Sequence, residues 1–113
     1  MTTSMIANLE RMIGGPRDGA LLRYSLGIEW LKDGNPGKAA QCFREAIARD
    51  RNYSAAWKQL GKALSESGEI EAALNAYQQG IVIAEEKGDL QAAREMTVFA
   101  KRLGKQGAGG SSS

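Results

Sequence analysis

The sequence predicts an all-α protein in which antiparallel helical hairpins stack into an α-α superhelix that ends in a capping helix. The dipeptide Leu-Gly occurs at positions 26–27 and again at positions 60–61, and a wider pattern of residues recurs with it. Turn residues separate apolar stripes that have helical spacing, and no stretch shows the period of two that is typical of a strand. We therefore expect helices and no strand.

Each copy of the dipeptide indicates a close contact between two helices. Gly27 and Gly61 fall within expected helices, where glycine is roughly 1 kcal/mol less favourable than alanine. A glycine at the same phase in both copies indicates that a neighbouring helix approaches too closely for a Cβ atom. Phe43 and Tyr77 follow these glycines at the same interval and are expected to project from the next helix into the same seam. Each copy is therefore expected to be a helical hairpin.

Turn signals set the expected boundaries of the helices. Gly34 and Gly68 fall where the first helix of each hairpin should end in a left-handed residue. Asn35 and Pro36 then supply an N-cap and a proline at the first helical position. The expected helices lie at about 20–33, 36–50, 54–67, 70–86 and 89–103.

Residues 1–19 form a separate N-terminal segment, an amphipathic helix followed by a linker. Gly14, Gly15 and Pro16 are expected to end this helix. Its stripe could cover the first hairpin, occupy the concave groove as a bound peptide would, or pair with another chain. The stripe consists of Met5, Ile6, Leu9, Met12 and Ile13.

Residues 88–105 are expected to form a capping helix that does not repeat the pattern. Gln91, Arg94 and Glu95 stand where the recurring interval would place the next copies of Trp57, Leu60 and Gly61. An apolar stripe of this helix would cover the last hairpin, with Phe99 near its edge, either packed against Tyr77 and Ile81 or exposed. Residues 106–113 are expected to be a flexible tail. The stripe consists of Leu90, Ala93, Met96, Ala100 and Leu103.

The recurring pattern, with its period of about 34 residues, resembles the tetratricopeptide repeat, which reads W-x2-L-G-x2-Y, then A-x3-F, then P. Repeat one spans residues 20–53 and repeat two spans residues 54–87. Arg23 departs from the pattern at the first Trp position, Leu64 at the Tyr position, and Arg51 and Glu85 at the Pro position. The motif around Trp57 also looks like small stand-alone bacterial repeat proteins. The matching residues are Leu26, Gly27, Trp30, Ala39 and Phe43, then Trp57, Leu60, Gly61, Ala73 and Tyr77.

The resemblance implies a protein- or peptide-binding adaptor whose first helices line a concave groove. Lys58 and Lys62 would hold an acidic side chain or a C-terminal carboxylate, as in chaperone-binding members of the family. Those members use Asn and Lys where repeat one has Tyr24 and Ile28. The alternative is that both lysines lie on a solvated helix face. The groove candidates are Tyr24, Ile28 and Leu31 with Leu21 in repeat one, and Lys58, Lys62 and Ser65 with Ala55 in repeat two.

Composition argues against catalysis. The chain has no histidine, which removes the commonest general base and the commonest nitrogen ligand of metals. Its carboxylate clusters, at residues 66–71 and 85–89, lie at expected helix ends, where acids are often solvated. Cys42 is expected to be a packed apolar residue. We therefore expect no enzyme activity, no catalytic residues, no cofactor and no metal.

Charge and hydropathy narrow the class of partner. The net charge of +2 is spread as +2, −2 and +2 over repeat one, repeat two and the remaining C-terminal residues, so no continuous basic face for nucleic acid is expected. No apolar run of about 18 residues and no signal-peptide layout is present, so we expect no membrane partner and a cytoplasmic protein. The protein is expected to be a monomer or a weak homodimer. The alternative function is a self-associating structural module that pairs through its N-terminal or capping helix.

Overall fold

The computed structural model describes residues 2–112 of the chain, and it is helical wherever it is regular. No strand occurs among these residues, so the all-α prediction is confirmed. The six helices are α1 (Thr2–Glu10), α2 (Ala20–Lys32), α3 (Pro36–Arg49), α4 (Ser54–Glu66), α5 (Ile70–Lys87) and α6 (Leu90–Ser112).

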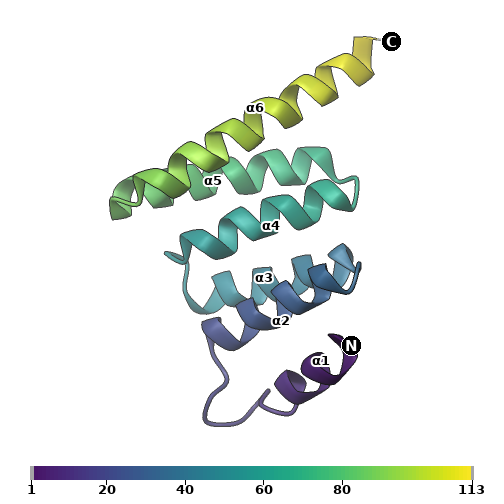
Figure 1. Ribbon diagram of the computed structural model, residues 1–113. Coiled ribbons are helices and arrows are strands. Elements are labelled where there is room, and N and C mark those ends of the chain that lie inside the picture. The colour runs from purple at the N-terminus through teal and green to yellow at the C-terminus, as the bar shows by residue number, and fades with distance from the viewer. Residues whose placement is uncertain (1, 113) are drawn as a thin grey trace.

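The helices stack in sequence order, with α1 at one end of the molecule and α6 at the other (Figure 1). Helix α2 packs against α3 and α4 packs against α5, which makes the two hairpins. Along one side of the stack, α2 also contacts α4 and α4 contacts α6, whereas α3 and α5 make no comparable contact within the described residues. The first helices therefore line the inner side of the superhelix, and the molecule measures 47 × 32 × 19 Å.

Aromatic rings rest on the two mid-helix glycines and close the hairpins. A Cβ atom added to Gly27 would lie within 2.7 Å of three ring carbons of Phe43, and one added to Gly61 within 2.6 Å of three ring carbons of Tyr77. Phe43 is fully buried and Tyr77 is nearly so. The predicted close approach at both glycines is confirmed, and an aromatic ring is what makes it close.

The helix ends agree with the turn signals. Gly34 and Gly68 have φ angles of 78° and 82°, in the left-handed region where a side chain is strained. The side chain of Asn35 accepts a hydrogen bond of 3.2 Å from the N–H of Lys38, and Pro36 begins α3. The predicted bounds of α2, α3, α4 and α5 therefore agree with the structure within one residue.

Helix α1 covers the outer face of repeat one with only part of its apolar stripe. The apolar stripe predicted a helix that extends to Gly14. In the structure α1 ends at Glu10, and residues 11–14 form turns. Ile6 is buried in a small cluster with Leu22, Leu26 and Cys42, and Leu9 packs against that cluster. The other three apolar side chains of the segment are at least 38% exposed: Met5, Met12 and Ile13.

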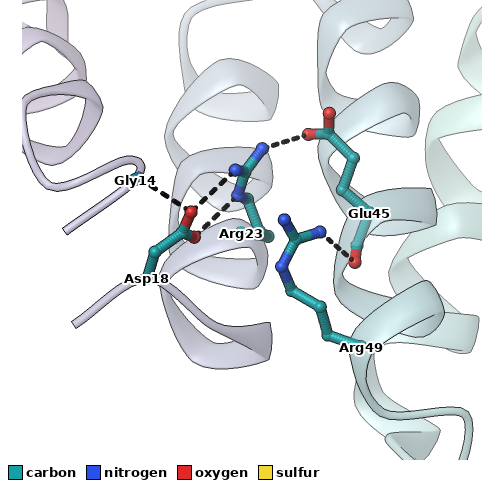
Figure 2. A network of polar contacts seen from close by, with 5 residues as sticks. All are labelled: Gly14, Asp18, Arg23, Glu45 and Arg49. Carbon is teal, nitrogen blue, oxygen red and sulfur yellow. Dashed lines mark hydrogen bonds and ion pairs between the residues drawn. The ribbon is translucent and has the colours of Figure 1, made fainter. Parts of the chain in front are cut away.

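Arg23 stands where the repeat pattern has a Trp, and it forms a polar network there (Figure 2). Arg23 is buried, and its guanidinium donates to both carboxylate oxygens of Asp18 at 3.0 and 2.9 Å. It also forms an ion pair of 3.1 Å with Glu45 of α3. The N–H of Gly14 donates to Asp18 at 2.9 Å, and Arg49 donates to the carbonyl oxygen of Glu45. These contacts join the α1–α2 linker to both helices of repeat one.

Helix α6 continues the packing of the repeats in a shifted register. The interval from the start of α4 at Ser54 to the start of α6 at Leu90 is longer, by two positions, than the interval from Ala20 to Ser54. The fourth and seventh residues of α6 are therefore Ala93 and Met96, both buried like Trp57 and Leu60 of α4. Residues 93, 96 and 97 are Ala, Met and Thr, so α6 packs at these positions without the Trp, Leu and Gly of the repeat pattern.

The end of α6 also differs from the sequence prediction. Helix α6 does not end near residue 103 but continues through Ser112, across most of the expected flexible tail of residues 106–113. Neither a proline nor a residue with positive φ interrupts the described backbone after Leu90. Ser113 lies outside the described residues.

Candidate binding groove

Two adjoining hollows form one groove on the inner side of the superhelix, between α4 and α6. The first has a volume of about 350 Å³ and the second of about 160 Å³, and both are lined by Tyr77 and Phe99. We call this combined site the α4–α6 groove. Its lining residues are Lys58, Gln59, Lys62, Ser65, Tyr77, Phe99, Arg102, Leu103 and Gln106.

An aromatic pair forms the centre of the groove. The ring centroids of Tyr77 and Phe99 lie 5.9 Å apart in a tilted arrangement. Tyr77 is buried beneath α4, whereas Phe99 remains 37% exposed, so it both packs on Tyr77 and faces solvent. Burial, together with the charge of Glu66, raises the pKa of Tyr77 to about 12. The phenol therefore stays neutral at physiological pH, and the centre of the groove is uncharged.

Three cations line this groove, and two of them have no ion-pair partner within the described residues. Lys58 forms an ion pair of 3.0 Å with Glu95 of α6. Lys62, one turn further along α4, and Arg102 on α6 make no such pair. No carboxylate is among the lining side chains of either hollow. The groove therefore has a local excess of positive charge beside an exposed aromatic ring.

The groove candidates of repeat one lie in a different environment. The ring of Tyr24 stacks on Tyr53 at a centroid distance of 4.9 Å and also contacts Phe43 at 5.7 Å. Ile28 and Leu31 are half-buried and pack against the main core. The structure therefore brings Lys58, Lys62 and Ser65 together at one groove. It places Tyr24 against the rings of Phe43 and Tyr53, and Ile28 and Leu31 against the main core.

Helix α6 contributes side chains that the sequence prediction did not assign to a site. Phe99, Arg102 and Gln106 line the groove, and Glu95 reaches Lys58 from the same helix. Their spacing of four, three and four positions from residue 95 to residue 106 is that of one helix face. This helical spacing can be read from the sequence. The spacing alone does not show whether that face of the helix points to the groove or to solvent.

Other hollows offer a different chemistry. On the outer side, a hollow of about 280 Å³ between α3 and α5 is lined by amides and partly buried apolar groups, including Asn75, Gln79 and Ile47. Arg44 supplies the single cation of that hollow. The α4–α6 groove is distinguished by its three cations and its exposed aromatic ring.

Potentially reactive groups are few in the part of the chain that the structure describes. Burial raises the pKa of the Cys42 thiol to about 11, as expected for a packed side chain. Among residues 2–112 there is no group of three or more potential metal ligands of the Cys, Asp, Glu or His types. Nor does any helix in this range combine the length and the apolar character that a membrane crossing needs.

Comparison with known proteins decides the family. Residues 31–96 match the family model described as tetratricopeptide repeat. The chain belongs to the tetratricopeptide repeat family. It is also similar to a TPR repeat-containing protein of Pseudomonas aeruginosa, with 42% identity over 99 residues, which covers 88% of this chain and 94% of the relative.

Solved structures share the tetratricopeptide fold. A protein from Bordetella parapertussis has a TM-score of 0.80 at 35% identity, with 92% of this chain and 90% of that chain covered. The Sgt2 TPR domain from Aspergillus fumigatus has the same TM-score at 22% identity, with 95% of this chain and 70% of that chain covered. The second likeness shows the fold alone. The predicted family and fold are thus confirmed for this small bacterial-type repeat protein.

Proposed function

We propose that this chain is a non-catalytic scaffold that binds an extended peptide segment of another protein in the α4–α6 groove. The observation that carries the proposal is the exposed ring of Phe99, flanked by Lys62 and Arg102, which have no ion pair in the described part of the chain. The fold of the family supports a general role in protein interaction.

The groove chemistry indicates which kind of peptide fits. An acidic side chain or a C-terminal carboxylate would accept charge-assisted hydrogen bonds from Lys62 and Arg102. A neighbouring apolar side chain would cover Phe99, which would remove apolar surface from water. The amide groups of Gln59 and Gln106 and the hydroxyl of Ser65 supply polar partners for the peptide backbone.

Binding of a defined probe peptide tests this proposal. The probe is a fluorescent hexapeptide of alternating glutamate and leucine, and the control is the same peptide with glutamine in place of glutamate. Lys62→Glu or Arg102→Glu should weaken binding of the acidic probe about fivefold or more, because each reverses a contact charge. Lys101→Glu is the matched control, since Lys101 is exposed on α6 and does not line the groove.

Salt gives a second readout of the same interaction. Affinity for the acidic probe should fall as ionic strength rises, because the Debye length shortens from about 10 Å at 0.1 M to about 3 Å at 1 M. Affinity for the glutamine probe should change little. Equal losses in Lys101→Glu and Lys62→Glu, or binding that does not respond to salt, would argue against the basic groove as the binding site.

A second candidate function is self-association through the two ends of the stack. In the described residues, every large apolar side chain that is exposed lies in residues 5–21 or 82–99. A polar outer face is what keeps the terminal units of a repeat protein soluble. Sedimentation over a wide range of protein concentration tests this candidate, with Leu90→Asp and Val98→Asp as variants that should reduce any association. The exposed side chains are Met5, Met12, Ile13 and Leu21, then Val82, Leu90, Val98 and Phe99.

A further inference from the structure

Lys58 differs from Lys62 and Arg102, the other two groove cations, because it already forms an ion pair with a carboxylate of the same chain. Its Nζ atom lies 3.0 Å from Oε1 of Glu95. The two residues are 37 positions apart in sequence, so the pair exists only because α4 and α6 pack side by side. Glu95 is on the α6 face that carries Phe99 and Arg102, at the end of the groove nearest the start of α6.

The pair is placed where solvent and a ligand can both reach it. The side chains of Lys58 and Glu95 are 27% and 40% exposed. A peptide carboxylate that approaches Lys58 therefore competes with that of Glu95. Alternatively, it can leave the pair intact and use Lys62 and Arg102. Ion pairs of this exposure are weak, so displacement is accessible.

We propose that Glu95 is an internal competitor: its carboxylate occupies Lys58, lowers the affinity of the α4–α6 groove for acidic peptides and directs a ligand carboxylate toward Lys62 and Arg102. This inference rests on the proposed function of the groove. In the free protein, the Glu95 carboxylate stands in for a ligand carboxylate. Removal of its charge turns a groove with two available cations into one with three.

The test compares the wild-type protein, Glu95→Gln and Glu86→Gln with the acidic and glutamine hexapeptides described above. Glu86 is the matched control, because its loss changes the net charge equally and it lies in a separate hollow with Asn75 and Val82. Glu95→Gln should bind the acidic probe about two- to fivefold more tightly than wild type at low salt. The gain should shrink at high salt and be absent for the glutamine probe.

A double-mutant cycle identifies Lys58 as the residue through which Glu95 acts. Lys58→Gln should change affinity for the acidic probe little in the wild-type background, where Glu95 occupies the lysine. In the Glu95→Gln background the same substitution should weaken binding about two- to fivefold. Thermal melts of all variants verify that each one remains folded at the temperature of the binding measurement.

The outcomes separate this inference from the proposed function. Binding that responds to Lys62→Glu but not to Glu95→Gln would overturn the competitor role and leave the groove proposal standing. Weaker binding by Glu95→Gln would also overturn it, since Glu95 would then be positioning Lys58 for the ligand. If no variant binds the acidic probe, the proposed function fails and the competitor role fails with it.

Discussion

Repeat one and repeat two share a sequence pattern but present different inner surfaces. Where repeat one has Tyr24 stacked on Tyr53 and Ile28 packed against the main core, repeat two has Lys58 and Lys62 on the wall of an open groove. The glycine and aromatic positions that close each hairpin are nearly the same in both repeats. The hairpin therefore depends on the shared positions, whereas the variable positions are free to pack or to bind.

The two repeats also differ at the first position of the repeat pattern. Trp57 is buried and donates a hydrogen bond of 2.8 Å from its indole to the carbonyl oxygen of Arg51. Arg23, its counterpart, is buried among carboxylates. Repeat two is thus anchored by apolar burial, and repeat one by an ionic network that includes the preceding linker. The stability that the ionic network of Arg23 provides should depend on pH, whereas the stability that the burial of Trp57 provides should not. Denaturation at two pH values can measure this difference.

The largest expected effect comes from removing the rings that close the hairpins. Phe43→Ala and Tyr77→Ala should each lower the free energy of unfolding by about 3–5 kcal/mol, because each leaves a cavity against a glycine. Urea denaturation followed by circular dichroism measures this loss. Leu21→Ala is the control: this side chain is 69% exposed, and its loss should change stability by no more than about 0.5 kcal/mol. A loss confined to one repeat would show that the two seams are not equivalent.

An intermediate effect is expected from filling the two glycine positions. Gly27→Ala and Gly61→Ala should each destabilise the protein by about 1–3 kcal/mol, because the added methyl group meets an aromatic ring. Gly104→Ala is the matched control, since a Cβ atom there meets nothing within 4 Å. That change should stabilise the helix by up to about 1 kcal/mol. Equal thermal midpoints for all three variants would contradict the close packing at these seams.

The smallest effect is expected at the ionic network of repeat one. Hydrogen bonds from Arg23 and from the N–H of Gly14 hold the pKa of Asp18 well below its usual range. The carboxylate therefore stabilises the fold above its ordinary pKa of about 4, and this contribution is lost as pH falls through the lowered value. Asp18→Asn should be less stable than wild type at pH 7, and the difference should shrink below about pH 4.

Urea denaturation at pH 7 and pH 3 measures the Asp18 effect. Glu86→Gln serves as the control in repeat two, because Glu86 is exposed and has no ion pair within the described residues. Its stability should follow that of the wild type at both pH values. A difference between Asp18→Asn and wild type that stays constant with pH would mean that the side chain acts by shape rather than by charge.

Local signals in the sequence were enough to predict the hairpins and their ends. Glycine at a left-handed position and Asn before Pro have few structural alternatives, so the ends of α2, α4 and α5 and the start of α3 follow from them. The groove was predicted only on its α4 side. Glu95 and Phe99 reach it because of the register of α6, and that register depends on the length of α5.

The partners of Arg23 were not predicted for a related reason. Asp18 lies in the α1–α2 linker and Glu45 lies on α3, so neither follows from the helical spacing of α2. The N-terminal stripe raised the same difficulty. Its five apolar side chains fit one helix face, but α1 ends at Glu10 and only Ile6 and Leu9 reach the core. Patterns along one helix do not specify how far a neighbouring surface extends.

The register of α6 has a consequence for anyone who would recombine or extend this protein. Helix α5 has 18 residues against 14 in α3, and its connection to the next helix is shorter, so α6 starts two positions later than a constant repeat length would place it. Two residues turn a helix by roughly 200° about its axis. Deleting two residues before Leu90 would present Arg94 and Glu95 to the core in place of apolar side chains. A helix grafted after Lys87 must therefore keep this longer interval between helix starts. The two extra residues, rather than the identity of any one side chain, determine which face of α6 points to the groove.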